Sequence, residues 1–375
     1  MNNIGVYIHV PFCLRKCPYC DFYSVGSTDM MDDYIKSLCR DIREKSDILS
    51  SRCADTVYFG GGTPSLMSER HVDDILTALG KTVSLSADAE ITLEVNPATA
   101  SLEKLQGYHS AGVDRLSIGM QSGDDEELSL LGRLHKHSDT VQTVSNAFKS
   151  GIDNISLDLM YALPMQRKET WLSSVGKAVK LGAKHISLYA LTLSEECRMS
   201  KMKYTFPEDE VQLKMYTDAL AYLSSEGYNQ YEISNCALPE FHSRHNMKYW
   251  RLDDYIGFGP SAHSMIDGRR YYVSGSVRDH ISGKSMETVD EVLTDEETVR
   301  EKIMLSLRLS EGLRFDSLKE LCRDANEYNT LKSSLISRGR KYTEGGYVSV
   351  SETGISLTQL GFFVSNTIIS DLMDA

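Results

Sequence analysis

The sequence predicts an α/β protein in which six consecutive β/α units precede a separate, mainly helical C-terminal module. Up to about residue 234, short runs of β-branched and aromatic residues alternate with longer amphipathic stretches. Around residues 236–295 this alternation breaks into loops that contain aromatic residues, glycine and proline. From about Thr298 onward, helical patterns are followed by a hairpin. Strands and helices that alternate over short links favour parallel β/α units.

The first part should contain six core strands and one additional strand. The core strands are expected at Val6–Val10, Thr56–Phe59, Glu90–Val95, Arg115–Ile118, Asn154–Asp158 and His185–Tyr189, and the extra strand at Asn229–Ile233. The helices between them are expected at Asp29–Leu49, Glu69–Leu79, Thr140–Lys149, Thr170–Leu181 and Glu208–Ser225. The periodicity fits a doubly wound sheet and an incomplete β/α barrel equally well, so both remain open at this point.

The C-terminal part has the pattern of a winged-helix-like module. Helices are expected at Val299–Leu309, Asp316–Asp324, Asn329–Ser337 and Thr358–Leu372, and strands at Tyr347–Val350 and Gly354–Leu357. A Ser-Glu-Thr-Gly turn joins the two strands. We therefore divide the chain into a β/α region at 1–235, a connecting region at 236–297 and a C-terminal module at 298–375.

Composition and charge exclude several classes of protein. The 375 residues are 41% hydrophobic and 25% charged, which disfavours intrinsic disorder and fibrous folds. A net charge of −13, and 9 basic against 10 acidic residues in 301–375, argue against nucleic acid as a partner. No apolar run approaches the roughly 18 residues of a membrane helix, and Met1–Val10 lacks the basic start of a secretory signal. We expect a cytoplasmic protein without a transmembrane segment.

Three of the eight cysteines are clustered directly after the first strand. Cys13, Cys17 and Cys20 have the spacing C-x3-C-x2-C, whereas the other five are scattered along a chain too long for a disulfide framework. Three thiolates suit a [4Fe–4S] cluster with one iron free of protein ligands. That iron can bind the amino and carboxylate groups of S-adenosylmethionine (SAM), and electron transfer to the sulfonium would cleave a C–S bond to give a 5′-deoxyadenosyl radical.

A zinc site is the alternative interpretation of this cluster. Structural zinc normally takes a fourth cysteine or histidine. Phe22 stands where a further cysteine would complete such a set, although His9 lies close by on the first strand. The ligand count and spacing favour the iron–sulfur cluster.

Polar residues recur at or just beyond the carboxyl ends of the expected strands, where a β/α barrel places its ligand-binding groups. Gly60, Gly61 and Gly62 follow the second strand, and their backbone amides could approach the amino-acid part of SAM. The later motifs are Glu94-Val-Asn-Pro, Asp114-Arg-Leu-Ser-Ile-Gly-Met-Gln121, Leu131-Gly-Arg133-Leu-His135, Asp158-Leu-Met-Tyr-Ala-Leu-Pro-Met-Gln166 and Leu188-Tyr-Ala-Leu191.

The cysteine spacing after the first strand resembles that of the radical SAM superfamily. This resemblance implies a partial (β/α)6 TIM-type barrel with the cluster at its mouth. The ordered motifs, and the C-terminal module, resemble the family of oxygen-independent coproporphyrinogen III dehydrogenases and their haem-chaperone relatives, the HemN and HemW types, over nearly the whole chain.

The resemblance also implies which residues bind the two cofactors. Cys13, Cys17 and Cys20 would hold the [4Fe–4S] cluster, and SAM would contact Tyr7, Tyr19, Gly61, Gly62, Thr63, Glu94, Gln121, Arg133 and Asp158. The chain departs from the family at one turn, since the Gly-Leu-Pro-Gly-Gln of the family is Ala162-Leu-Pro-Met165-Gln here. The shape of that turn is therefore in question.

Two features favour the haem-chaperone branch over the dehydrogenases. The dehydrogenases carry a fourth cysteine where Phe22 stands, and a longer segment before the cluster than the 12 residues found here. Residues 242–250 read HSRHNMKYW, which resembles the His-Asn-x-x-Tyr-Trp signature of the HemW type. A neutral imidazole ligates haem iron well, so His245 is the first candidate ligand. His242 and His263 are the next candidates, and Cys236 ranks below them.

We therefore expect a radical SAM protein that binds haem and passes it to haem-requiring apoproteins. The resemblance implies respiratory recipients at the inner face of the membrane and a cluster-dependent homo-oligomer. The competing hypothesis is an enzyme that converts propionates of coproporphyrinogen III to vinyl groups with release of CO2. A nucleic-acid regulator that uses the C-terminal module is a third hypothesis, and the acidic charge argues against it. Whether SAM cleavage accompanies haem transfer stays open at this stage.

Overall fold

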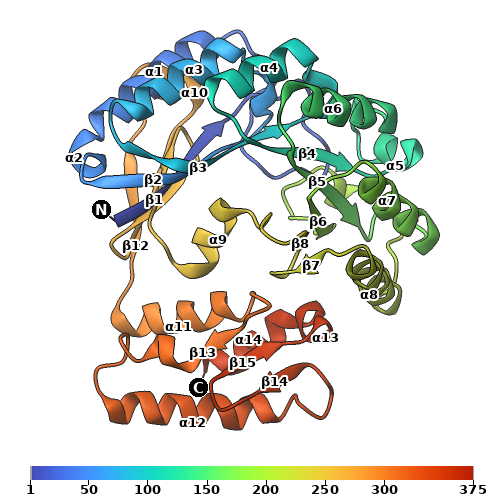
Figure 1. Ribbon diagram of the computed structural model, residues 1–375, viewed down its shortest axis with the longest axis vertical. Coiled ribbons are helices and arrows are strands. Elements are labelled where there is room, and N and C mark those ends of the chain that lie inside the picture. The colour runs from blue at the N-terminus through green and yellow to red at the C-terminus, as the bar shows by residue number, and fades with distance from the viewer. Residues whose placement is uncertain (1, 375) are drawn as a thin grey trace.

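The six β/α units form a partial barrel in the computed structural model, which describes residues 2–374 (Figure 1). One twelve-stranded sheet has the order β12-β11-β10-β9-β1-β2-β3-β4-β5-β6-β8-β7. The central strands are β1 (Asn2–Val10), β2 (Arg52–Gly61), β3 (Ser84–Val95), β4 (Arg115–Gln121), β5 (Asn154–Tyr161) and β6 (His185–Ala190). They are parallel and follow one another in chain order. A doubly wound sheet would reverse its order at a switch point. The partial barrel is thus confirmed.

Amphipathic helices cover the outer, convex face of this sheet (Figure 1). They are α1 (Met31–Glu44), α2 (Ser46–Leu49), α3 (Glu69–Gly80), α4 (Leu102–Ala111), α5 (Asp125–Leu130), α6 (His137–Ser150), α7 (Lys168–Lys180) and α8 (Asp209–Ser225). In α1 the residues Tyr34, Leu38 and Ile42 recur every fourth position and are completely buried. The expected helix 29–49 is interrupted at Lys45, which separates α1 from α2.

The expectation that residues 236–295 consist of loops is wrong. This stretch forms α9 (Arg244–Arg251), β9 (Tyr255–Phe258), β10 (His263–Ile266), β11 (Arg269–Val273), α10 (Val277–Ile281) and β12 (Glu287–Val292). Strand β9 pairs in parallel with β1, and the next three strands continue antiparallel from it. These strands are short and have no clear alternation. Strand β9 pairs with the free edge of β1, and β10, β11 and β12 then extend the sheet by pairing in turn with the strand before them.

The opposite edge of the sheet also differs from expectation. The extra strand expected at 229–233 is reduced to β7 (Asn229–Gln230), and the chain then turns into β8 (Asn235–Ala237). Strand β8 pairs antiparallel with β6. The backbone of Ile233 turns away from the sheet because its N–H donates to the carbonyl of Arg308 in the C-terminal module, at 2.9 Å.

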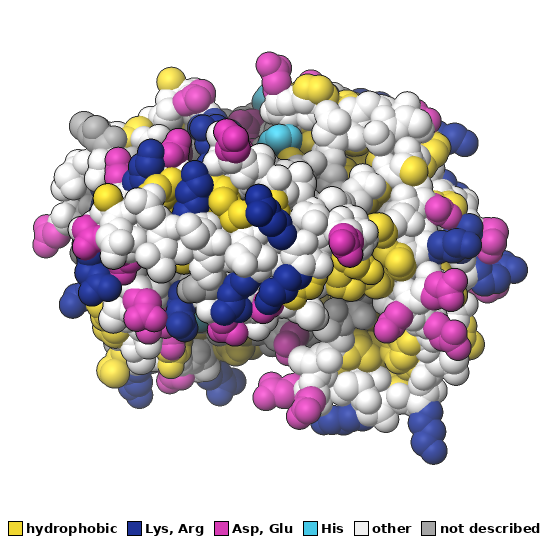
Figure 2. Space-filling model, turned by 90° about the horizontal axis from the view of Figure 1, so that it is seen from below, with side chains coloured by type: hydrophobic (Ala, Val, Ile, Leu, Met, Phe, Trp, Pro, Cys, Tyr) yellow, Lys and Arg dark blue, Asp and Glu magenta, His cyan; other side chains and the backbone are white. Residues whose placement is uncertain are grey.

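The C-terminal module packs below the barrel (Figure 1). It contains α11 (Asp295–Ser306), β13 (Leu313–Arg314), α12 (Ala325–Arg340), β14 (Val348–Val350), β15 (Gly354–Leu357), α13 (Gln359–Phe363) and α14 (Ser365–Met373). The helix expected at 316–324 is only a short 3-10 turn at Phe315–Leu318. Basic and acidic side chains are interspersed on the face seen in Figure 2. Within residues 2–374, no helix is both long and apolar enough to cross a membrane.

The turn after β5 uses a left-handed backbone at two non-glycine residues. Ala162 has φ 59° and Met165 has φ 57°. These are the two positions at which the resembling family carries glycine. The left-handed conformation costs roughly 1–2 kcal/mol for a residue with a Cβ atom. Replacement of the two family glycines by Ala162 and Met165 therefore leaves the left-handed backbone of the turn unchanged. It places strain at both positions.

We predict that Met165→Gly stabilises the protein by about 0.5–1 kcal/mol, because strain is relieved and the exposed side chain contributes little packing. Urea unfolding at neutral pH measures the change. The matched control is Met202→Gly, at an exposed loop methionine with φ −96°. There the same substitution only adds freedom to the unfolded chain, so it should lower stability. Equal effects of the two substitutions would contradict the strain argument.

Candidate functional site

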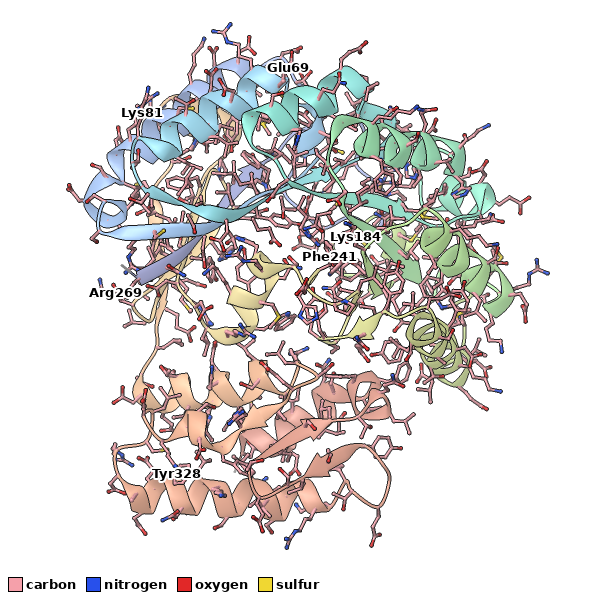
Figure 3. All side chains as sticks on the ribbon, viewed as in Figure 1. Glu69, Lys81, Lys184, Phe241, Arg269 and Tyr328 are labelled. Carbon is pink, nitrogen blue, oxygen red and sulfur yellow. The ribbon has the colours of Figure 1, made fainter. Side chains whose placement is uncertain are left out.

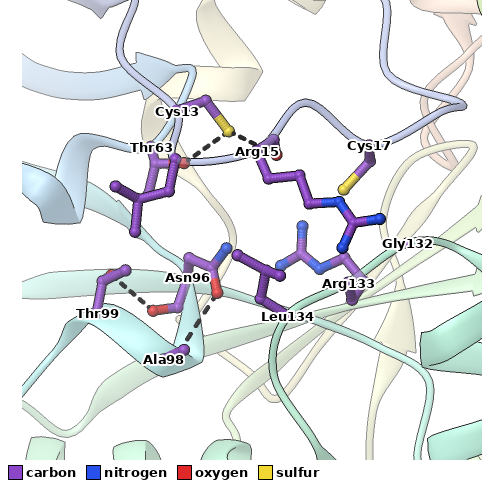
Figure 4. A pocket seen from close by; sticks show the side chains of 11 residues that line it. Cys13, Arg15, Cys17, Thr63, Asn96, Ala98, Thr99, Gly132, Arg133 and Leu134 are labelled. Carbon is purple, nitrogen blue, oxygen red and sulfur yellow. Dashed lines mark hydrogen bonds between the residues drawn. The ribbon is translucent and has the colours of Figure 1, made fainter. Parts of the chain in front are cut away.

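The three clustered cysteines lie on the loop that follows β1 at the mouth of the barrel. All eight cysteine thiols of the chain are free, and Cys13, Cys17 and Cys20 are each partly exposed. Cys13 and Cys17 line a small cavity together with Thr63, Asn96 and Arg133 (Figure 4). Cys20 lines the adjoining barrel cavity, which shares those last three residues. The strand-to-loop geometry thus brings the three thiols to one opening.

These residues fit a [4Fe–4S] cluster. The Thr63 hydroxyl donates to Cys13 Sγ at 3.5 Å, a contact that can equally serve a thiolate bound to iron. In the described part of the chain, no three His, Cys, Asp or Glu side chains converge closely enough to hold one metal ion. A four-iron cluster makes no such demand, since each cysteine binds a different iron. The donor set is three thiolates, the ligands such clusters use.

The interior of the barrel is a polar cavity of about 420 Å³ rather than a packed core. In closed β/α barrels the inward-facing side chains are mostly Val, Ile and Leu. Here the inward positions of β4, β5 and β6 are nearly all polar or small. The lining residues from these strands are Arg115, Ser117, Gly119, Gln121, Ser156, Asp158, Met160, His185, Ser187 and Tyr189. A polar interior open at the mouth is suited to a polar ligand.

Glu94, at the end of β3, is held by two donors beside the glycine turn. It accepts from the Tyr58 hydroxyl at 3.0 Å and from the Gly61 N–H at 3.2 Å. Burial raises the pKa of Glu94 to about 7, with nearby Asp158 adding to the shift and the two hydrogen bonds opposing it. The carboxylate is therefore poised for a cationic group that would restore its charge.

The glycine turn can approach the ligand because no side chain fits there. Gly61 has φ +110°, and a Cβ atom at this residue would lie 2.5 Å from the His9 ring. A Cβ at Gly62 would lie 2.6 Å from the carbonyl oxygen of Phe12. Only glycine satisfies both requirements. The turn therefore presents bare backbone to the cavity.

Asp158, on β5, is surrounded by serine hydroxyls. Ser117 donates to it at 2.9 Å, Ser187 at 2.8 Å and Ser156 at 3.3 Å. Burial raises the pKa of Asp158, and these serines lower it. Two donors from the neighbouring strands β4 and β6, and one from β5 itself, fix the carboxylate in one orientation within the cavity.

Arg133 and Gln121 meet at the mouth. Arg133 donates to the carbonyl of Gly119 at 3.0 Å. Burial alone would lower its pKa, but the neighbouring Tyr19 and Cys17 raise it, so the guanidinium is a stable cation beside the cysteines. Gln121 ends β4 in the left-handed conformation, with φ 62°.

Eight of the nine predicted SAM residues line this cavity. They are Tyr19, Gly61, Gly62, Thr63, Glu94, Gln121, Arg133 and Asp158. Tyr7 does not line it. The Tyr7 ring lies behind that of Tyr58, with ring centroids 6.2 Å apart, and its hydroxyl bonds His9 Nδ1 at 3.1 Å. Burial lowers the pKa of His9 to about 4. Tyr7 and His9 therefore support the residues that line the cavity and do not line it themselves.

Helix α9, which carries the HNMKYW motif, lies inside the curve of the sheet and closes the barrel floor (Figure 1). Glu90 of β3 accepts from the N–H groups of Arg244 and His245, both at 3.1 Å. Lys248 pairs with Asp55 of β2 at 2.8 Å. The segment before α9 is also fixed, since Lys184 Nζ lies 4.4 Å above the ring of Phe241 (Figure 3).

The ring of His245, the predicted haem ligand, is enclosed. Its exposed fraction is 1%. Nδ1 bonds Thr56 Oγ1 at 2.8 Å, and Nε2 bonds the Tyr249 hydroxyl at 2.9 Å. Burial lowers the pKa of His245 to about 3, so the ring is neutral. Both nitrogens are thus occupied. The other two histidine candidates, His242 and His263, are exposed.

Arg115 is the main cavity residue that sequence reasoning missed. It is 2% exposed, and its Nε has no hydrogen-bond partner among the described residues. Its nearest carboxylate is Glu90, at 4.0 Å. His185, which bonds Ser156 at 2.8 Å and Tyr231 at 2.8 Å, was likewise not singled out. One sequence signal could have identified both residues: each is a large polar residue at the start of a strand, where a packed barrel would have an aliphatic side chain.

Comparison with known proteins identifies related chains over the full length. Residues 7–178 match the radical SAM superfamily, and residues 293–364 match the HemN C-terminal domain. The chain is 33% identical to "Heme chaperone HemW" of Bacillus subtilis, over 97% of both chains. It is 34% identical to "Heme chaperone HemW" of Escherichia coli, over 86% of this chain and 87% of that one.

A solved structure confirms the fold. The coproporphyrinogen III oxidase HemN of Escherichia coli, described as a radical SAM enzyme, superposes with a TM-score of 0.84. The match covers 99% of this chain and 90% of that one, at 20% sequence identity. At this identity the similarity establishes a shared architecture and nothing finer.

We predict that His245→Ala lowers the free energy of unfolding by about 2–4 kcal/mol at pH 7.5, because it leaves a cavity and unpaired partners. The difference in free energy of unfolding between the wild type and His245→Ala should become smaller at acid pH. A histidine pKa lowered from 6.5 to about 3 contributes stability that is fully present above pH 6.5 and is lost as the pH falls below it. The expected loss is about 1.4 kcal/mol per pH unit.

Urea unfolding at pH 7.5, 6.5 and 5.5 measures this dependence. The control is His263→Ala, since His263 is exposed and its removal should change stability little at any of the three values. A deficit for His245→Ala that stays constant from pH 7.5 to 5.5 would show that the buried ring is not held neutral.

Proposed function

The chain belongs to the HemW family of radical SAM proteins, and on that premise we propose that it binds haem and delivers it to haem-requiring apoproteins. One observation carries this proposal: a relative named as a heme chaperone is similar over 97% of both chains. The HNMKYW segment at residues 245–250 supports it. The recipients that we propose are respiratory haem proteins, reached from the cytoplasmic side, and we propose that the cluster also promotes self-association.

The radical SAM superfamily implies a [4Fe–4S] cluster and SAM as cofactors. We propose Cys13, Cys17 and Cys20 as the cluster ligands. When bound, the cluster would supply the electron for reductive cleavage of SAM. We assign residues 1–235 to the cofactor-binding barrel, 236–297 to the region that carries α9, and 298–375 to the C-terminal module.

The cavity residues would hold SAM by complementary charge and shape. Arg133 would pair with the SAM carboxylate, and Glu94 with its ammonium group. Asp158 would accept from a ribose hydroxyl through Oδ2, which in the described part of the chain accepts only from Ser117, whereas Oδ1 also accepts from Ser156 and Ser187. The bare backbone at Gly61, Gly62 and Thr63 would contact the amino-acid part, and Tyr19 the adenine. Tyr7 would act from behind, by holding Tyr58 and His9 in place.

The haem ligand is proposed on the same segment. Ligation by His245 requires exchange of its bond to Tyr249, because both ring nitrogens are occupied in the present conformation. His242 is exposed and stacks on Tyr231 with ring centroids 4.1 Å apart, so it can ligate without such a change. His263 is the third candidate. Alanine variants of all three histidines therefore have to be compared in the same haem titration.

We expect the cluster-reconstituted protein to bind close to one haem per chain in an anaerobic titration followed by absorbance. Among His242→Ala, His245→Ala and His263→Ala, only the variant that removes the axial ligand should shift the Soret spectrum. His109→Ala, at the far end of α4, is the matched control. Absence of haem binding by the wild-type protein would refute the chaperone function.

The competing enzymatic function makes a different prediction. Reconstituted protein incubated with coproporphyrinogen III, SAM and a reductant would release CO2 and form vinyl groups if it were the dehydrogenase. We expect no such product. Its formation at a rate proportional to protein concentration would replace the chaperone proposal with the enzymatic one.

We predict that SAM binds more tightly as the pH rises from 6 to 8. The pKa of Glu94 is raised to about 7 in the free protein, so below that value binding of the SAM ammonium requires loss of a proton. Calorimetric titration of the cluster-free protein with SAM, whose amino group is then protonated and not bound to iron, should show a Kd that falls severalfold over this range. Glu94→Gln should bind SAM weakly at every pH. If Glu94→Gln retains the wild-type pH dependence, another group is responsible.

A further inference from the structure

Large apolar side chains are exposed around the mouth of the barrel. We call six of them the mouth rim: Leu14, Phe22, Leu134, Met165, Tyr189 and Met202. Phe22 is 66% exposed, Leu14 59% and Met165 70%. Five of them come from the four loops that follow β1, α5, β5 and β6, and Tyr189 lies near the end of β6. Single exposed apolar residues are ordinary, but a ring of them around one opening marks an interaction site.

The contacts of these loops show that the mouth rim is continuous. Leu14 and Leu134 line the small cavity that contains Cys13 and Cys17 (Figure 4). Phe22 and Tyr189 line the barrel cavity beside it. The loop after β6 is tied to the cysteine loop, since the Met199 N–H donates to the carbonyl of Pro18 at 2.8 Å. The Met165 N–H donates to the carbonyl of Thr205 at 2.9 Å, which adds the turn after β5.

The mouth rim is basic in an otherwise acidic chain. Residues 13–20, 131–137 and 198–206 contain no Asp or Glu, whereas the whole chain has a net charge of −13. Six exposed cations lie in these segments: Arg15, Lys16, Lys136, Arg198, Lys201 and Lys203. Acidic residues occur just outside them, at Asp21, Glu195, Glu196 and Glu208. The surface thus combines apolar area with positive charge.

The cavity beneath is too small to hold both SAM and a porphyrin. Its volume of about 420 Å³ suits a single small molecule, and SAM would fill it. Its floor is closed by α9 and lined by polar groups such as Arg115 and Ser156. A large apolar ring would also keep water away from the carboxylates of Glu94 and Asp158, which is unfavourable. A flat ligand must therefore lie above the cavity, across the mouth.

We propose that the mouth rim is the docking surface for haem. The apolar face of the macrocycle lies on Phe22, Leu134 and the other rim side chains, and the two propionates are directed to the rim cations. Haem has a flat apolar macrocycle and two propionates that are ionised at neutral pH. The macrocycle matches the apolar area of the surface, and the propionates match its positive charge.

This inference rests on the proposed haem-binding function and adds the location. It places the cargo directly over the cysteine loop. Haem across the mouth lies on the opposite side of the cavity from His245, which contacts Thr56 of β2 and Glu90 of β3 at the floor. A Soret shift in His245→Ala would therefore place haem at the floor and overturn this location.

Two double variants test the two properties separately. Met165→Ser/Met202→Ser removes apolar area from rim residues that line neither cavity, and Lys201→Glu/Lys203→Glu reverses charge. Each should raise the Kd for haem about tenfold or more in anaerobic titration of cluster-loaded protein, while cluster absorbance and SAM affinity stay unchanged. The charge variant should lose little affinity for haem dimethyl ester, in which the propionates are blocked.

Matched controls carry the same substitutions elsewhere on the surface. Val289→Ser/Val292→Ser replaces exposed apolar residues of β12, and Lys149→Glu/Lys284→Glu replaces exposed lysines away from the mouth. These should bind haem like the wild type.

The outcomes distinguish this inference from the proposed function. If wild-type protein binds no haem, the function itself fails. If wild type binds haem and both rim variants bind it equally well, the function stands and the docking site is overturned. If the rim variants keep haem affinity but lose self-association or binding to vesicles of anionic lipid, the surface serves a second copy or a membrane, and the proposal is also overturned.

Discussion

The burial of α9 inside the open barrel is the constraint on which the rest of the structure depends. The six parallel strands do not close on themselves, since β1 and β6 do not pair, so the interior needs other elements to cover its open side and its bottom. Helix α9 closes it, with its first N–H groups on Glu90 and with Lys248 paired to Asp55. Both ions of that pair are largely buried, and removing one partner would leave the other uncompensated. The chain then adds β9 to the edge of β1, which fixes the helix from both sides.

Because α9 closes the floor, the barrel interior opens at the mouth. A ligand inside the cavity therefore lies at a different depth from a ligand that lies across the mouth. The interior is polar because hydrogen bonds satisfy most of its groups, as the three serines around Asp158 illustrate. The mouth is apolar and basic. A polar cofactor below and a flat apolar anion above would therefore meet at the cysteine loop. The same arrangement keeps His245 beneath the cavity, with its ring neutral and enclosed.

Local patterns predicted the strands of the barrel well and the region 236–295 poorly. The six central strands were expected within their observed bounds, because buried parallel strands have strong β-branched signals. Strands β9 to β12 have weak signals of their own and depend on a chain of pairings that starts with β9 on the edge of β1. Glu94 was found because it lies at the end of β3, whereas Arg133, in the loop after α5, and Asp158, in the middle of β5, were found because they belong to the family motifs. Arg115 and His185 begin strands, and their role in the cavity depends on which face of the sheet turns inward.

The sequence by itself determined the β/α repeat, the cysteine loop and the family motifs, because spacing and periodicity are local properties that survive without a tertiary context. Only the tertiary structure decided that strands β1 to β6 follow in order as a barrel, that α9 fills its floor, and that Ala162 and Met165 adopt left-handed backbones. It also decided that both nitrogens of His245 are occupied. These features depend on contacts between residues far apart in the chain, and such contacts leave no periodic signal.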